Sequence, residues 1–146
     1  MKNKKGFTLI ELLATLAIIA LISAVAIPNI VNLSNGIRKD NMLDDAKKLI
    51  SLAKYKVNKD YEIRNNPPHT FTFNELNVND DIGKDPDGGD YDQVTSKVVY
   101  SIENNVAQYC VVLIGKYRAI GSESECIKED NLYSRSNVVD RVSTYN

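Results

Sequence analysis

The 146-residue sequence predicts an α+β protein in which one long N-terminal helix packs on a small antiparallel β-sheet. Three observations lead to this fold class. Residues 7–27 are almost all apolar, residues 42–57 repeat apolar side chains at three- and four-residue steps, and β-branched and aromatic runs separated by turn residues fill 97–120. We expect the first half of the helix to span a membrane and the second half to cover the sheet.

The helix is predicted over residues 7–59. Its apolar run, 7–27, would extend about 32 Å as a helix, which is long enough to cross a bilayer. A single apolar stripe then indicates one buried helix face, formed by Met42, Leu43, Ala46, Leu49, Ile50, Ala53 and Val57. Between the two parts, Pro28 removes the hydrogen bond to the Ala24 carbonyl and Gly36 weakens the following turns, so we expect a helix break or kink there.

The remaining elements follow from turn and capping signals. The segment 64–69 contains two prolines and ends the helical region, and Thr72 followed by Glu75 has the form of a capping box, which predicts a short helix near 73–77. Three strands are predicted as an antiparallel meander at 97–102, 107–114 and 116–120. Residues 136–144 fit an edge strand or a short helix equally well.

Composition argues against several classes of protein. The net charge of −1 gives no reason to expect nucleic-acid binding, and we identify no direct nucleic-acid site. Two cysteines and one histidine do not form a zinc motif. His69 is expected in an exposed loop, with no nucleophile spaced around it for a catalytic triad. A phosphate-binding GxxxxGK[ST] loop is absent from the sequence. We therefore expect a protein that is not an enzyme.

The N-terminus carries a targeting signal with one unexpected residue. Lys2, Lys4 and Lys5 precede the apolar run and predict an N-terminus at the cytoplasmic face. A cleaved secretory signal could use the "AVA" site at 24–26, and a plain signal anchor is a second interpretation. Both leave Glu11 unexplained, because a carboxylate costs about 2–4 kcal/mol at the middle of a membrane and less near its surface.

The string "KKGFTLIELL" resembles the class III signal of type IV prepilins, a short basic leader ending in Gly, followed by Phe and by Glu at the fifth mature position. These residues are Gly6, Phe7 and Glu11. The resemblance covers about the first 30 residues, including Pro28, which falls at a usual proline position of these filaments. It implies cleavage after Gly6 by a prepilin peptidase, methylation of the Phe7 amine, and partial unwinding around the proline in a filament. The chain then divides into a leader at 1–6, a hydrophobic transmembrane and assembly helix at 7–30, and a head of the pilin fold at 31–146.

The resemblance further implies a structural subunit of a type IV pilus. Such a subunit is single-pass in the cytoplasmic (inner) membrane until an assembly platform and motor extract it into an extracellular filament. The partners would be copies of the same chain, with or without minor pilins, and the filament would serve adhesion, motility or DNA uptake. A pseudopilin of a type II secretion or competence system is the alternative, and a membrane-anchored or secreted binding domain is a more distant one.

Glu11 is expected to pair with the Phe7 amine of an adjacent subunit. The two charges are complementary and weakly screened in an apolar bundle, and one such pair selects a single register between helices that otherwise slide freely. A Glu11 side chain that reaches the lipid headgroups is the alternative.

Cys110 and Cys126 are expected to form a disulfide. A domain delivered outside the membrane can keep one, and pilins commonly tie down their C-terminal region in this way. Two free thiols, one of them buried, are the alternative.

The segment 80–92 is rich in aspartate and glycine, and its "KDPDGGDY" stretch loosely resembles a region of major pseudopilins, some of which bind calcium nearby. Asp85, Asp87 and Asp90 are weak candidates for calcium ligands. The EF-hand pattern is absent, and aspartate and glycine are common turn formers, so a solvated turn and no cofactor are the expectation.

Overall fold

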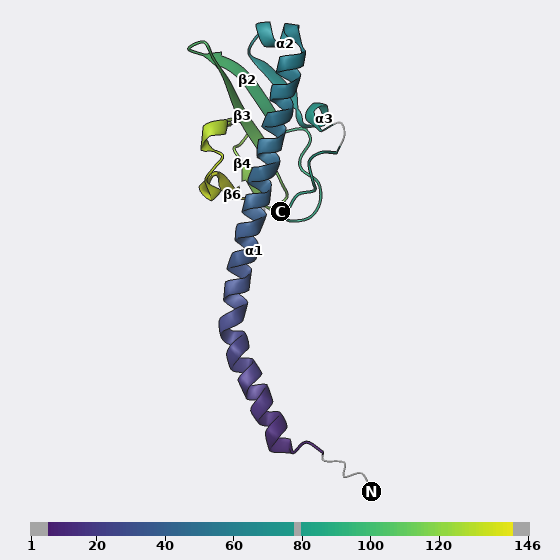
Figure 1. The fold of residues 1–146 in the computed structure, drawn as a ribbon, viewed down its shortest axis with the longest axis vertical. Coiled ribbons are helices and arrows are strands. Elements are labelled where there is room, and N and C mark those ends of the chain that lie inside the picture. Colours follow the sequence, from purple (N-terminus) through teal and green to yellow (C-terminus); the bar gives the residue numbers. More distant parts are fainter. Residues whose placement is uncertain (1–5, 78–79, 142–146) are drawn as a thin grey trace, which may run out of the picture. The chain divides into compact units, whose positions relative to one another are not determined.

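The structure is a computed structural model that describes residues 6–77 and 80–141 (Figure 1). Within these residues the elements, in chain order, are α1 (Leu9–Lys59), α2 (Tyr61–Asn65), β1 (His69–Thr72), α3 (Phe73–Leu76), β2 (Lys97–Glu103), β3 (Val106–Ile114), β4 (Arg118–Ile120), β5 (Ile127–Lys128), the 3-10 helices η1 (Glu129–Asn131) and η2 (Arg135–Asn137), and β6 (Val138–Asp140). The chain divides into two compact units, residues 1–36 and 37–146. The second unit is called the head below.

Helix α1 confirms the prediction of one long helix. It runs without interruption through Pro28 and Gly36, so the helix does not break there, and a kink at these residues stays a prediction. A proline deletes one backbone hydrogen bond, and the turns on either side keep theirs, so the helix can continue past it. Partial unwinding around Pro28 in a filament stays a prediction.

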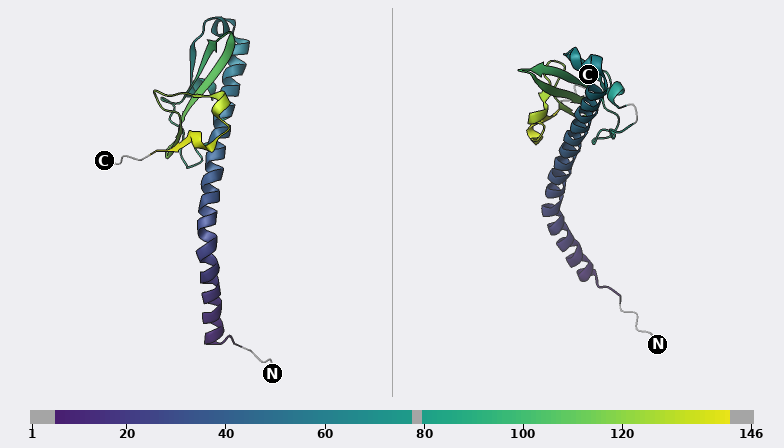
Figure 2. Two further views of the ribbon diagram at one scale, coloured as in Figure 1. Left: turned by 90° about the vertical axis from the view of Figure 1, so that its left-hand side faces the viewer. Right: turned by 45° about the horizontal axis from the view of Figure 1, so that its top comes forward.

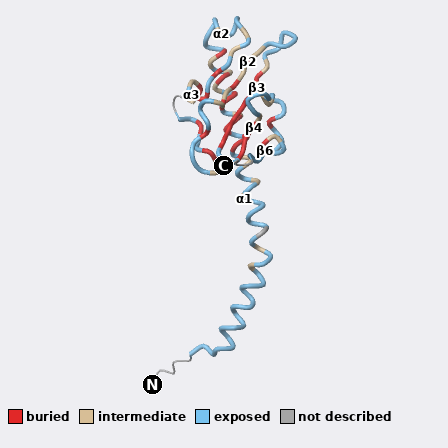
Figure 3. The backbone as a smooth tube through the Cα atoms, turned by 180° about the vertical axis from the view of Figure 1, so that it is seen from behind, coloured by how far each residue is buried: buried red, intermediate tan, exposed pale blue. Residues whose placement is uncertain are grey.

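In the first unit, nearly every residue of α1 is exposed (Figure 3), and most of these residues are large and apolar. Leu9, Ile10 and Leu21 are each more than 70% exposed. A single helix cannot bury its own side chains, and this one is long and apolar enough to cross a membrane. An exposed apolar surface of this extent is typical of a segment that contacts a membrane or another protein.

The head contains an antiparallel sheet in the order β1-β2-β3-β4-β6, with the short β5 also paired to β3. Strands β2, β3 and β4 are the predicted meander. The C-terminal segment was predicted to form either an edge strand or a short helix. It contains both a short 3-10 helix, η2, and an edge strand, β6, which pairs with β4. Residues 142–144 of that segment lie outside the described residues.

Strand β1 was not predicted, and it corrects the expectation for His69. That residue begins β1 opposite Tyr100, is half-buried, and places its ring 4.5 Å from the ring of Phe71. Four residues after a pair of prolines are too few to show a periodic pattern. Their extended conformation depends on pairing with β2, about thirty residues further along the chain.

The core of the head lies between α1 and one face of the sheet (Figures 1 and 2). All seven residues of the predicted apolar stripe on α1 are buried. They pack in one cluster with sheet residues such as Phe71, Val98, Val111 and Leu113. Each large aliphatic side chain removed from water in this way stabilises the fold by about 1.5–3 kcal/mol, so this contact holds the head together.

Local signals behave as predicted at two further points. The Thr72 hydroxyl accepts a hydrogen bond from the Glu75 N–H at 3.2 Å, and this cap starts α3, which buries Phe73 and Leu76. At the β2–β3 turn, Asn104 and Asn105 both have positive φ (52° and 62°), the conformation of a tight type I′ hairpin turn.

The structure contains a disulfide between Cys110 on β3 and Cys126, just before β5, with Cα atoms 5.5 Å apart. Cys126 packs on the outer face of the sheet against Val112, Ile114 and Ala119. The bridge encloses β4, a strand of only three residues, and so ties the irregular segment after β4 to the longest strand.

We therefore predict that reduction lowers the melting temperature of the head. In the chain-entropy account, closing a loop of this length stabilises by about 3 kcal/mol. Circular dichroism melts with and without reductant test this, with the Cys110→Ser/Cys126→Ser variant as the reductant-insensitive control. Peptide mapping without reductant should recover the two cysteines linked. Two thiols that alkylate freely in the native chain would contradict the prediction.

Candidate processing and assembly site

The residues around the predicted cleavage point lie outside α1. Gly6, Phe7 and Thr8 are non-helical, and Phe7 is 89% exposed. The Gly6–Phe7 bond is therefore open to a protease that binds extended backbone. A Cβ atom added to Gly6 would meet no other atom within 4 Å, so the chain's own packing does not require glycine at this position. The leader lysines Lys2, Lys4 and Lys5 lie outside the described residues.

Glu11 forms a capping box at the start of α1. Its Oε2 accepts hydrogen bonds from the Thr8 N–H and the Thr8 hydroxyl, both at 2.8 Å, and its own N–H donates to Thr8 Oγ1 at 3.3 Å. The sequence analysis missed this role, although "TLIE" has the same S/T-x-x-E form that was used for Thr72 and Glu75. In the single chain, Glu11 thus has a partner within its own helix.

The other polar side chains of this segment are also satisfied by the backbone of α1. Thr15 donates to the Leu12 carbonyl at 2.8 Å, Ser23 to the Ile19 carbonyl at 2.8 Å, and Asn29 to the Val25 carbonyl at 3.2 Å. Internal satisfaction of polar groups is the condition for placing a segment in hydrocarbon. Thr15, Ser23 and Asn29 therefore find backbone acceptors within their own helix, whereas Pro28 leaves the Ala24 carbonyl without its helical N–H donor.

The comparison with protein families agrees with this arrangement. Residues 1–27 match the family model of the prokaryotic N-terminal methylation motif. The chain carries the class III prepilin signal. This signal indicates a type IV pilin or pseudopilin-like prepilin protein, which a prepilin peptidase processes. Comparisons with curated proteins and with solved structures gave no match.

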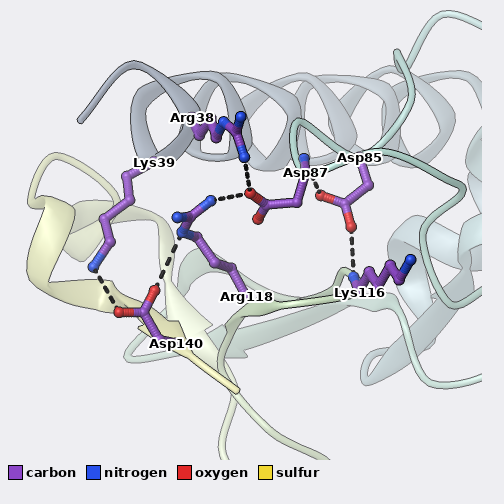
Figure 4. A network of polar contacts seen from close by, with 7 residues as sticks. All are labelled: Arg38, Lys39, Asp85, Asp87, Lys116, Arg118 and Asp140. Atoms are coloured by element: carbon purple, nitrogen blue, oxygen red, sulfur yellow. Dashed lines mark hydrogen bonds and ion pairs between the residues drawn. The ribbon is translucent and has the colours of Figure 1, made fainter. Parts of the chain in front are cut away.

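The aspartate-rich loop is only in part the solvated turn that was expected (Figure 4). Asp85 is 3% exposed; its Oδ1 accepts the Asp87 N–H at 3.0 Å and its Oδ2 accepts the Lys116 N–H. The Asp87 carboxylate contacts the guanidinium groups of Arg38, at 3.0 Å, and Arg118. Asp90 is exposed, as expected for a turn.

Two contacts hold this loop against the head, and a third, between Asp92 and Thr95, is local to the end of the loop. A Cβ at Gly115 would lie 2.7 Å from Asp85 Oδ2, so glycine permits the close approach of the carboxylate to the β3–β4 turn. The Tyr91 hydroxyl donates to the buried Asp45 carboxylate at 2.9 Å, and burial together with that charge raises the pKa of Tyr91, which keeps the hydroxyl protonated. The hydroxyl and N–H of Thr95 hold the pKa of Asp92 below its ordinary value.

The loop therefore satisfies its two buried aspartates with protein donors. In residues 6–77 and 80–141, no group of three or more His, Cys, Asp or Glu side chains is placed to hold a metal ion. Asp85 and Asp87 accept hydrogen bonds from backbone amides and guanidinium groups at the positions where calcium would need free oxygens.

We predict that calcium changes the stability of the chain little. Calcium chloride, added after treatment with a chelator, should move the melting temperature by no more than a few degrees, because the candidate ligands are already occupied. Magnesium chloride at the same concentration controls for ionic strength. A larger shift that is specific to calcium would show that the loop binds this ion.

We predict that Gly6→Val blocks leader cleavage and leaves uncut precursor in the membrane fraction. A peptidase that fits closely around the scissile bond favours a residue without Cβ. The matched control is Gly83→Val, because Gly83 also has open space around it and lies in the head. Mass spectrometry and N-terminal sequencing provide the measurement. The wild-type chain should begin at methylated Phe7, whereas a start at Ile27 indicates a secretory signal and a start at Met1 a plain anchor.

Proposed function

We propose that the chain is a structural subunit of a type IV pilus, assembled from the membrane into a helical surface filament. The observation that carries this proposal is the continuity of the prepilin signal with a helix whose apolar side chains are exposed on all sides. Lipid covers this surface before assembly, and the helices of other subunits cover it afterwards. The subunit is structural and not catalytic, and its partners are the prepilin peptidase, the assembly platform and the motor.

The polymer follows from the symmetry of such contacts. A helix that packs beside the next copy with an axial shift makes a heterologous contact, and contacts of this kind build open helical filaments when they do not close into a ring. The filament would hold the α1 segments inside and the heads outside. Adhesion, motility and DNA uptake are properties of such a polymer.

The pairing of Glu11 with the Phe7 amine is the proposed register device. Cleavage after Gly6 removes the leader lysines and creates a charged amine on an exposed residue four positions before Glu11. An apolar helix surface has many registers of similar energy, and one charged pair in surroundings of low dielectric favours one of them. Before assembly, the carboxylate is held by Thr8, so a neighbouring amine must compete with or add to that contact.

The structure offers two roles for Glu11, and substitutions separate them. Glu11→Val removes both charge and cap, Glu11→Gln keeps a capping side chain without the charge, and Thr8→Val removes the cap hydroxyl and keeps the charge. If the charge pair drives assembly, both Glu11 variants should lose filaments and accumulate cleaved monomer in the membrane, while Thr8→Val should still assemble.

The measurement is to count filaments by electron microscopy and to quantify membrane-held monomer in cells with only the variant chain. Wild-type filament numbers in Glu11→Gln, with loss in Glu11→Val, would assign Glu11 to capping and contradict the pairing. Long surface fibres in the wild type distinguish a pilin from a pseudopilin.

A further inference from the structure

Charged side chains link the first helical turn of the head to three distant segments. Arg38, Lys39 and Asp40 are consecutive residues of α1, and each contacts a different distant segment. Arg38 contacts Asp87 in the aspartate-rich loop at 3.0 Å, Lys39 contacts Asp140 on β6 at 3.8 Å, and Asp40 accepts two hydrogen bonds of 2.6 Å from Arg135 on η2. The residues of these ion pairs, with Arg118, are called the charged collar below: Arg38, Lys39, Asp40, Asp87, Arg118, Arg135 and Asp140.

The inner ion pair of the collar is buried, and its outer ion pairs are exposed to solvent. Arg118 bridges Asp87 and Asp140 (Figure 4), and the side chains of Arg118 and Asp87 are only 10% and 3% exposed. The outer partners Asp140 and Arg135 are 70% and 60% exposed. Dissolved salt screens exposed pairs strongly and buried pairs weakly. The outer contacts can therefore break while the inner pair keeps the loop and β4 together.

Apolar contact between α1 and the sheet begins only after the collar. The first buried residue of α1 is Met42, 1% exposed, whereas Ile37 is 49% exposed and Arg38 and Asn41 are also exposed. Arg38 and Lys39 lie four and three positions before Met42, so they occupy the same face of the helix, one turn earlier. The collar therefore lies one helical turn before the end of the core at Met42.

We propose that the charged collar is a releasable clamp on α1. When it is closed, contact of the helix with the head begins at Arg38. When its outer ion pairs break, residues 37–41 lift from the head, Met42 becomes accessible, and the remaining apolar stripe stays packed. Charged contacts suit this task because they depend on distance and direction and respond to screening, unlike the non-directional apolar contacts that follow them. The clamp belongs to the head and does not depend on assembly into a filament.

Oxidation of Met42 reports the state of the clamp. The chain has two methionines, Met1 and Met42, which mass spectrometry distinguishes by peptide. A thioether oxidises to the sulfoxide when peroxide reaches it. The experiment treats the full chain in detergent micelles with hydrogen peroxide and compares the wild type with the Arg38→Gln/Asp40→Asn double variant. The matched control is Asp44→Asn, which breaks an exposed ion pair formed within α1, Asp44–Lys47, and leaves the ion pairs of the collar in place.

The clamp predicts that Met42 oxidises several times faster in the double variant and at the wild-type rate in the control. Raising the sodium chloride concentration from about 0.05 M to about 0.5 M should accelerate oxidation in the wild type more than in the double variant, because it screens the same outer pairs. Circular dichroism melts monitor the whole head. Equal Met42 oxidation in all three chains overturns the clamp, and so does faster oxidation fully explained by a lower melting temperature, because the collar would then only add general stability.

Discussion

The contact between one face of α1 and the sheet is the interaction on which the rest of the structure depends. Over residues 9–27 the apolar side chains of the helix point in every direction, whereas in the head they form a single stripe. The two parts of the helix are therefore suited to different surroundings. The sheet buries the apolar stripe of the helix between Met42 and Val57. Residues 9–27 are exposed in the described chain, and this difference is the basis of the proposal that a membrane, and then other subunits, surround them.

At the N-terminal end of this contact, before Met42, polar and charged groups replace the apolar ones. Before Met42, the loop, β6 and η2 contact the helix through the charged side chains of Asp87, Asp140 and Arg135. After Met42, Ile82, Ile120 and Val138 pack with the helix in the apolar core. Asp85 and Asp87 therefore stabilise the fold as acceptors of local hydrogen bonds and as partners of arginines. A loop whose composition fits a solvated turn is in this way fastened to the head at Gly115, Asp45 and Arg118.

Glu11 caps its own helix and is also the residue proposed to pair with a neighbouring subunit. A capping box explains how a carboxylate can stand in an apolar segment of a single chain, because Thr8 supplies two donors to one oxygen. Capping does not require a negative charge, since glutamine caps as well. The choice of glutamate in this context is what the proposed pairing with a neighbouring amine would explain.

The sequence by itself determined the elements that depend on a periodic pattern or on residues close together in the chain. The helix over Leu9–Lys59, the strands from Lys97 to Ile120, the cap at Thr72 and the prepilin signal are each read from residues within a few turns of one another. Even the Thr8–Glu11 cap was available in that form, although it was missed. The tertiary structure decided what depends on a distant partner. Strand β1 and the half-buried His69 require β2, strand β6 requires β4, and the buried aspartates require Arg38, Arg118 and the turn at Gly115. These outcomes depend on which segments meet in space, and pairing between segments thirty to a hundred residues apart leaves no pattern in either segment alone.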